Sequence, residues 1–155
     1  MTKISHCFRV YSVPIAQSLF RHGCIDRKTG KLVMPNINSK FYPNFILGYI
    51  DGNGTLGLYY YRQNTSFSLS ISGSPKLLSD MKIIIDNKFK TLGYLNKITH
   101  HGTVQTLKYQ NKHITIQILD WLYGDSQESA RMNRKYNYYL YMKYVYENYI
   151  LKVPF

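Results

Sequence analysis

The sequence predicts an α+β protein with an antiparallel sheet, and three observations lead to that class. The chain has 155 residues, 45% of them hydrophobic, which is the usual length of one domain with its own core. From residue 41 onward, the periodicity follows the order helix, strand, strand, helix, strand, strand, helix, helix. The strands come in adjacent pairs joined by short polar loops, as in antiparallel hairpins. We expect a single domain over residues 1–155, with an N-terminal extension over 1–40 and a core over 41–155.

The N-terminal extension is predicted to hold one strand and one helix. Residues 5–11 alternate as a strand does, and residues 13–22 form a short helix with Ser12 as its N-cap and Gly23 as its stop signal. The apolar residues of this helix are expected to face inward: Ile15, Leu19 and Phe20.

The core contains four predicted helices. The first is apolar from Phe45 to Ile50 and ends at Gly54. The second follows Ser74 as N-cap and Pro75 at its first position, and closes at Gly93. Its buried stripe is Leu77, Leu78, Met81, Ile84, Ile85 and Phe89. The last two are predicted at residues 111–124 and at about 127–149.

Two hairpins are predicted, with strands at 55–62 and 67–73 and at 94–101 and 103–110. The second strand places its apolar residues on one face and its serines on the other, as in a half-buried strand. We expect the polar face to suit the major groove of DNA, although a solvated sheet face has the same pattern. Its residues are Tyr59, Tyr61, Arg62, Gln63, Ser66, Ser68, Lys97, Thr99, His101 and Gln105.

Charge is the strongest global signal. Twenty Lys and Arg residues against eight Asp and Glu give a net charge of +12, whereas a small soluble domain typically carries about 2 to 8. The basic residues are spread along the chain and not collected in a tail. A folded basic domain indicates a phosphate-rich partner, and we predict nucleic acid.

Other features limit the possible sites and location. No window approaches the ~18 continuous apolar residues of a membrane span, and the N-terminus lacks the apolar segment of a signal peptide. Cys7 and Cys24 are interpreted as reduced thiols. We therefore expect an intracellular protein, in cytoplasm or nucleoid, an organelle or a phage-infected cell. His100 and His101 are adjacent on a strand, so they point to opposite faces and do not predict a shared metal site.

The stretch ILGYIDGNG at residues 46–54 resembles the motif of the LAGLIDADG homing endonucleases, with Gly48, Ile50, Asp51 and Gly54 on its fixed positions. The likeness covers nearly the whole chain. It implies the family's αββαββα core, here with an N-terminal strand-helix extension and a long C-terminal helix. The further stretches that resemble one branch of the family lie at residues 8–37, 70–82 and 118–142.

In this family two motif helices pack across a two-fold or pseudo-two-fold axis, where small residues let their backbones touch. That packing explains why the helix contains Gly48 and Gly52, each of which costs a helix interior about 1 kcal/mol relative to alanine. One motif per chain implies a homodimer with an isologous interface, although the chain also looks like the second half of a two-motif protein. The resemblance assigns to that interface Ile46, Gly48, Tyr49 and Gly52.

The family's chemistry lies at the helix ends, where the last acidic residue of the motif and the preceding backbone carbonyl bind Mg²⁺. The matching residues here are Asn53 and Gly52, and an asparagine cannot offset the charge of the cation. Three interpretations are open: Asn53 is an engineered substitution, it is a natural loss, or Asp51 takes over as the ligand. Arg134 or Lys135 corresponds to the family's basic residue near the cleaved phosphates, with a solvated basic face as the alternative.

The resemblance implies site-specific binding of duplex DNA by a homodimer, at a long near-palindromic site. The implied ancestral activity is Mg²⁺-dependent double-strand cleavage, with Mg²⁺ as cofactor only if the protein is active. The rival interpretations are a non-cleaving transcriptional regulator and an intron RNA-splicing cofactor (maturase).

Overall fold

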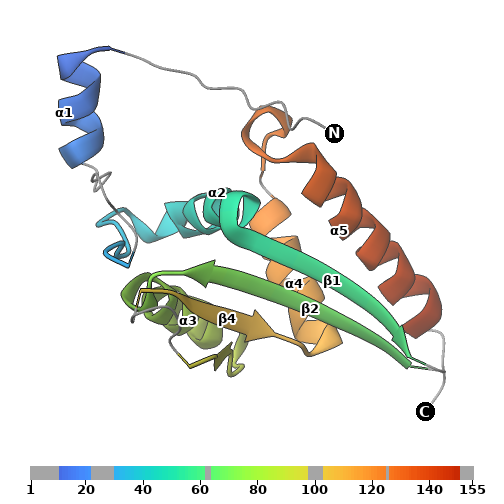
Figure 1. Ribbon diagram of the computed structural model, residues 1–155. Coiled ribbons are helices and arrows are strands. Elements are labelled where there is room, and N and C mark those ends of the chain that lie inside the picture. The colour runs from blue at the N-terminus through green and yellow to red at the C-terminus, as the bar shows by residue number, and fades with distance from the viewer. Residues whose placement is uncertain (1–10, 22–29, 62–63, 98–102, 125, 151–155) are drawn as a thin grey trace, which may run out of the picture.

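The sheet is antiparallel throughout. The structure, a computed structural model, describes residues 11–21, 30–61, 64–97, 103–124 and 126–150. Within these ranges four strands form one sheet in the order β1-β2-β4-β3 (Figure 1). Their bounds are Gly54–Tyr61 for β1, Asn64–Gly73 for β2, Tyr94–Leu95 for β3 and Gln105–Tyr109 for β4. All three pairings are antiparallel, so the predicted α+β class is confirmed.

Four helices pack on one face of this sheet. They contribute to a single core together with Phe67, Leu69 and Ile71 of β2, which are fully buried. The opposite face of β2 carries the serines, as the alternation predicted. The bounds of these helices are Tyr42–Asn53 for α2, Pro75–Phe89 for α3, Lys112–Tyr123 for α4 and Asn133–Val145 for α5. Within the described ranges, no helix is long and apolar enough to cross a membrane.

The helix boundaries follow the local signals in some places and depart from them in others. Helix α4 begins after Asn111, whose side chain caps it by accepting from the N–H of Ile114, and it stops at Gly124. Helix α3 has Pro75 in its first turn as predicted, but the Ser74 hydroxyl donates to the carbonyl of Leu32 and makes no cap. The prediction that this helix ends at Gly93 is wrong, because α3 ends at Phe89 and Lys90 follows it with a left-handed backbone.

The last helix is interrupted, contrary to the prediction of one helix over about 127–149. A 3₁₀ turn at Glu128–Ala130 precedes α5, and the π-helical turn η3 at Tyr146–Ile150 follows it. Between the first two, Arg131 and Met132 have extended backbones. Met132 is the N-cap of α5, and its N–H donates to the Asp51 carboxylate.

Helix α1 (Val13–Arg21) differs from the prediction in its packing. Every one of its residues is exposed, including Ile15, Leu19 and Phe20. Figure 1 shows α1 apart from the sheet and the other helices. The amphipathic pattern correctly predicted a helix with one apolar face, but no described element of this chain covers that face. The predicted strand over 5–11 lies outside the described residues.

Candidate nucleic-acid interface

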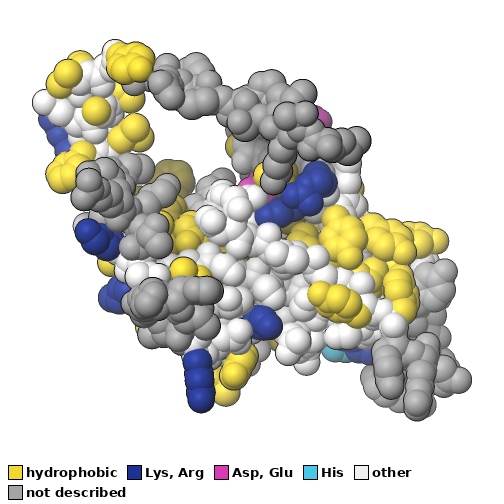
Figure 2. Space-filling view, viewed as in Figure 1, with side chains coloured by type: hydrophobic (Ala, Val, Ile, Leu, Met, Phe, Trp, Pro, Cys, Tyr) yellow, Lys and Arg dark blue, Asp and Glu magenta, His cyan; other side chains and the backbone are white. Residues whose placement is uncertain are grey.

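The open face of the sheet is lined mainly by hydroxyl groups. By the strand register, Ser70 pairs with Lys108 and Ser72 with Thr106, and their side chains share this face. The hydroxyls of Ser72 and Thr106 are 3.2 Å apart. Lys108 adds positive charge to this face. The side of the molecule seen in Figure 2 shows basic groups at several separate points, not as one continuous patch.

Tyr59 covers part of this face. A Cβ added to Gly57 would lie 2.6 Å from the Tyr59 ring and 2.6 Å from the Ser68 hydroxyl. The Tyr59 side chain therefore lies back across Gly57, over the space that a Cβ would occupy. Ser68 is buried, whereas Tyr59 and Ser66 are exposed. A ligand on this face would meet the tyrosine before it met Ser68.

The structure brings only some of the predicted DNA-binding residues to the open face. Tyr59, Ser66 and Ser68 lie there, and Lys97 is exposed just after β3. Gln105 does not, because it shares the core side of β4 with Leu107 and its amide donates to the carbonyl of Asn96. The residues of β4 on the open face are Thr106 and Lys108. Tyr61 is described only in its backbone, and the remaining predicted residues lie outside the described ranges: Arg62, Gln63, Thr99 and His101.

The carboxyl end of α2 is bound by Lys135, from the first turn of α5. Its ammonium nitrogen (Nζ) donates to three backbone carbonyl oxygens, those of Ile50 at 2.5 Å, Asp51 at 2.8 Å and Gly54 at 2.7 Å. An ammonium group has three N–H donors, so every one of them is used in this arrangement. The unpaired carbonyls at a helix end carry partial negative charge, which a cation offsets.

Lys135 is enclosed by the protein. It is 8% exposed, and burial lowers its pKa, an effect that Asp51 opposes and Arg134 reinforces. Arg134, by contrast, is exposed at the start of α5, with its guanidinium near the sulfur of Met132. Of the two basic residues predicted near the reaction site, Arg134 is the one open to an external ligand.

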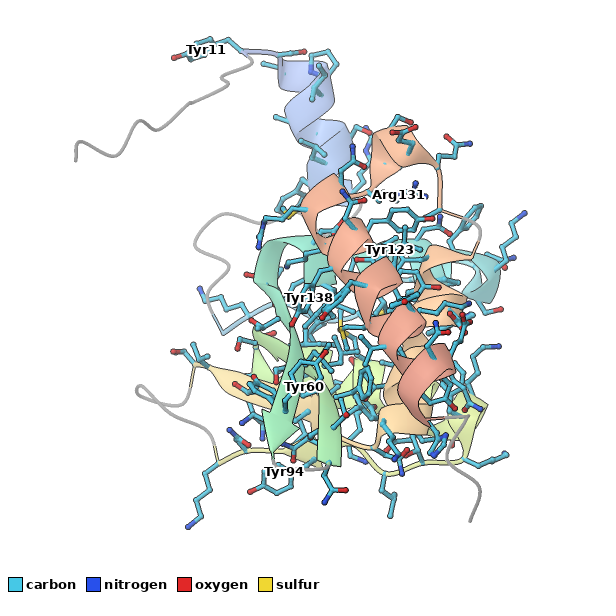
Figure 3. All side chains as sticks on the ribbon, turned by 90° about the vertical axis from the view of Figure 1, so that its right-hand side faces the viewer. Tyr11, Tyr60, Tyr94, Tyr123, Arg131 and Tyr138 are labelled. Atoms are coloured by element: carbon cyan, nitrogen blue, oxygen red, sulfur yellow. The ribbon has the colours of Figure 1, made fainter. Side chains whose placement is uncertain are left out.

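Asp51 is bound by the segment that precedes α5. Its Oδ2 accepts from the N–H of Met132 at 2.8 Å, and its Oδ1 is buried without a partner among the described residues. The Tyr123 hydroxyl and the Arg131 Nε are also buried, and neither has a hydrogen-bond partner in the part of the chain that the structure describes. Burial raises the pKa of Tyr123, Asp51 raises it further, and Arg131 lowers it. Figure 3 shows Tyr123 and Arg131 near the start of α5.

The residues at this helix end do not fit a Mg²⁺ site. Magnesium takes near-octahedral oxygen ligands at about 2.0 to 2.1 Å and is usually held by carboxylates. Asn53 is exposed and offers only a neutral amide, while one oxygen of Asp51, Oδ2, is engaged by Met132 and the other, Oδ1, is buried. Lys135 takes three of the carbonyls. Within the described ranges, no group of three or more His, Cys, Asp or Glu residues could hold a metal ion.

The residues of α2 that were predicted to form the dimer interface differ in how exposed they are in the single chain. Gly48 and Gly52 are exposed, and a Cβ added at either would meet no atom within 4 Å. Ile46 is fully buried in the chain's own core, so its assignment to the interface is wrong. Tyr49 is half-buried, and its hydroxyl donates to the carbonyl of Ser72 at 3.3 Å.

Sequence reasoning missed the contacts that join α5 to the motif helix and to β1. The hydroxyl oxygen of Tyr138 on α5 accepts a hydrogen bond from the N–H of Leu58 in β1 at 3.2 Å. Arg131 stacks over the ring of Tyr136 at 3.4 Å. Figure 3 shows Tyr138 and Tyr60 in the region between β1 and α5. The sequence has 16 tyrosines, but their spacing does not reveal which backbone groups they bind.

The arrangement of elements matches solved structures of one class, although the sequence alone gives no match to a protein-family model or to a curated protein. The homing endonuclease I-CeuI complexed with DNA has a TM-score of 0.55 and 14% identity, over 87% of this chain and 67% of that one. I-GzeII, a LAGLIDADG homing endonuclease in complex with its DNA target, has a TM-score of 0.54 and 16% identity, over 88% of this chain and 44% of that one.

A mutant of I-SmaMI has a TM-score of 0.52 and 18% identity, over 72% of this chain and 38% of that one. This chain therefore spans less than half of I-GzeII and I-SmaMI. The chain has the LAGLIDADG homing-endonuclease fold, which confirms the resemblance read from residues 46–54.

Proposed function

We propose that this protein binds duplex DNA through the open face of its sheet, as a two-fold dimer, and does not cleave it with Mg²⁺. The observation that carries the proposal is the open, hydroxyl-lined sheet face in a fold whose solved examples I-CeuI and I-GzeII are bound to DNA. The net charge of +12 supports it, because neutralising phosphates supplies much of the affinity for DNA.

The dimer part of the proposal rests on α2. Its exposed glycines leave room for a second backbone at close approach, and a two-fold interface uses the same surface on both copies. A dimer would place two sheets in line along one duplex, so the DNA site would be long and near-palindromic.

Selection of bound sequences from random duplex DNA tests binding and symmetry together. We expect a palindrome, recovered equally well with EDTA and with Mg²⁺, and an affinity that falls steeply with salt. Recovery of an asymmetric site would contradict the two-fold arrangement, and failure to enrich any sequence would contradict specific DNA binding.

Nicking of a supercoiled plasmid that carries the selected site tests the absence of cleavage. We expect no nicking by the protein in Mg²⁺, because the helix end offers the neutral Asn53 and a buried Asp51 in place of exposed carboxylates. Asn53→Asp, measured beside it, shows whether one carboxylate per chain is all that is missing. Efficient cutting by the unaltered protein would overturn this part of the proposal.

A second candidate, RNA binding in intron splicing, is favoured by one surface. Exposed aromatic and apolar side chains gather on α5 (Figure 2). The Tyr60 hydroxyl of β1 lies 3.1 Å from that of Tyr141. Tyrosine rings stack on unpaired RNA bases. Competition between the selected duplex and structured RNA separates the two functions, since RNA that binds more tightly than the duplex would favour the splicing cofactor.

A further inference from the structure

We propose that Lys135 is a built-in cation that offsets the charge at the carboxyl end of α2, so that this end does not require a divalent metal ion. Its bonds go to the carbonyls of Ile50, Asp51 and Gly54, beside the Gly52 carbonyl that the resemblance gives to the metal. The cation site itself stands on the single chain and does not depend on DNA binding. Its consequence for the dimer, argued below, rests on the proposed function.

The geometry suits an ammonium group. The three acceptor oxygens lie 2.5 to 2.8 Å from the nitrogen, within the range of charge-assisted hydrogen bonds, whereas Mg²⁺ requires oxygens at about 2.0 to 2.1 Å. They belong to Ile50, Asp51 and Gly54, so they surround the last turn of the helix. Three donors meet three acceptors, and the ammonium is left with no N–H for a phosphate or a water.

The charges near the ammonium are consistent with a single positive charge at this site. Asp51 acts on Lys135 as a favourable charge, while Arg134 acts as an unfavourable one. A divalent ion at the same carbonyls would have to displace the ammonium or lie beside it, with a second cation already near. Asn53 could not offset that added charge, because its amide is neutral.

The Lys135 ammonium changes what the carboxyl ends of two α2 helices need in order to pack together. Two helix carboxyl ends brought together repel each other through their partial negative charges. Here each end carries its own buried ammonium, so two copies can approach without a shared metal. The same bonds tie α5 to α2, which fixes the start of α5 and with it the exposed Arg134.

Chemical rescue tests the site. Lys135→Ala removes the propylammonium part of the side chain, and we expect the Tm to fall by roughly 10 °C, as for the loss of several charge-assisted hydrogen bonds in a chain of this size. Added propylammonium should restore part of that loss, because it supplies the missing N–H donors. Tetramethylammonium, which has the charge but no N–H, and Mg²⁺ at equal ionic strength should not.

Lys143→Ala is the matched control on the same helix. Lys143 pairs with Asp120 at a partly exposed site, so this variant should lose little stability and show no response to propylammonium. Rescue of Lys135→Ala by Mg²⁺ at millimolar concentration would overturn the proposal, and so would an unchanged Tm in that variant.

A measurement on the unaltered protein covers the case in which Lys135→Ala does not fold. Mn²⁺ broadens the amide NMR signals of residues near a divalent site. We expect no selective broadening at residues 50–54, and selective broadening there would overturn the proposal. Because neither experiment uses DNA, their failure is distinct from a failure of the selected-duplex assay.

Discussion

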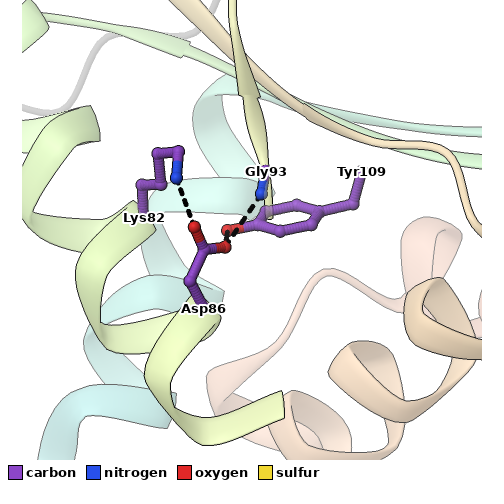
Figure 4. A network of polar contacts seen from close by, with 4 residues as sticks. All are labelled: Lys82, Asp86, Gly93 and Tyr109. Carbon is purple, nitrogen blue, oxygen red and sulfur yellow. Dashed lines mark hydrogen bonds and ion pairs between the residues drawn. The ribbon is translucent and has the colours of Figure 1, made fainter. Parts of the chain in front are cut away.

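The carboxyl ends of α2 and α3 are closed in different ways. The end of α3 is closed by residues that follow it closely in the sequence, whereas the end of α2 is closed by a residue far along the chain. At α3, Asp86 of the last turn accepts from the N–H of Gly93 and the hydroxyl of Tyr109, both at 2.9 Å, and pairs with Lys82 one turn earlier (Figure 4). At α2, the group that closes the helix is Lys135, more than 80 residues away in sequence.

The two ends therefore differ in what they need in order to form. The α3 end is completed within the hairpin that follows it, and Lys90 allows the turn by adopting a left-handed backbone at φ 51. Burial raises the pKa of Tyr109, and its hydrogen bond to Asp86 raises it further, so the phenol stays a donor. The α2 end forms only when α5 has docked. A helix end that is closed by a residue distant in sequence, as at α2, becomes ordered only together with the element that carries that residue.

The largest expected effect is at the α3 end. Asp86→Ala removes an acceptor from two donors and breaks the pair with Lys82, so we expect a loss of about 3 kcal/mol in the free energy of unfolding. Asp86→Asn keeps a carbonyl oxygen for Gly93 and Tyr109 and should cost about 1 kcal/mol. Urea unfolding of the two variants measures the difference, and equal losses would show that the charge, not the acceptor, matters.

The next largest effect is expected at Gly54, compared with its neighbour Gly52 at the end of α2. A Cβ on Gly54 would lie 2.6 Å from the Ile50 side chain and 2.7 Å from the Ile50 carbonyl, one of the Lys135 acceptors. We expect Gly54→Ala to lower the free energy of unfolding by about 2 kcal/mol because of this overlap. Gly52→Ala is the matched control, since its Cβ meets nothing within 4 Å. A neutral Gly54→Ala would show that the helix end can relax without losing Lys135.

A smaller effect is expected at Asp51. Asp51→Ala leaves the N–H of Met132 without its acceptor and removes the favourable charge near Lys135, so the free energy of unfolding should fall by about 1.5 kcal/mol. Asp51→Asn, which retains an acceptor, should lose less. Hydrogen exchange of the Met132 amide measures the contact directly, and unchanged protection in Asp51→Ala would contradict it.

The same contrast explains what could be predicted from the sequence. Helix α4 was placed correctly because its boundary signals are local, ending at Gly124. The motif at 46–54 predicted the fold, and the serine alternation of β2 predicted the open face. The register of β4 was off by one residue at Gln105, because alternation alone does not fix which residue of a strand pairs with its neighbour.

The contacts at the carboxyl end of α2 could not be predicted from the sequence. Lys135 and Asp51 were both singled out, yet nothing in their spacing shows that one binds backbone carbonyls and the other a backbone N–H. Helix α1 shows the same limit, since its apolar face was predicted and its exposure was not. Periodicity reports that a face is apolar, and only the tertiary arrangement decides what covers it.

The smallest expected effect on stability concerns Gly48, on the face of α2 that the rest of the chain leaves open. Gly48→Ala should raise the free energy of unfolding of the single chain by up to about 1 kcal/mol, because alanine favours a helix and its Cβ meets no atom within 4 Å. A side chain at this position would separate two α2 helices packed at close approach. The larger substitution Gly48→Val should therefore abolish the dimer while the chain stays folded. Sedimentation at matched concentrations measures this, with Ile83→Ala on the exposed side of α3 as the control that should not change assembly. A dimer that survives Gly48→Val would place the interface elsewhere, and an unaltered protein that stays monomeric on its selected DNA would contradict the two-fold arrangement altogether.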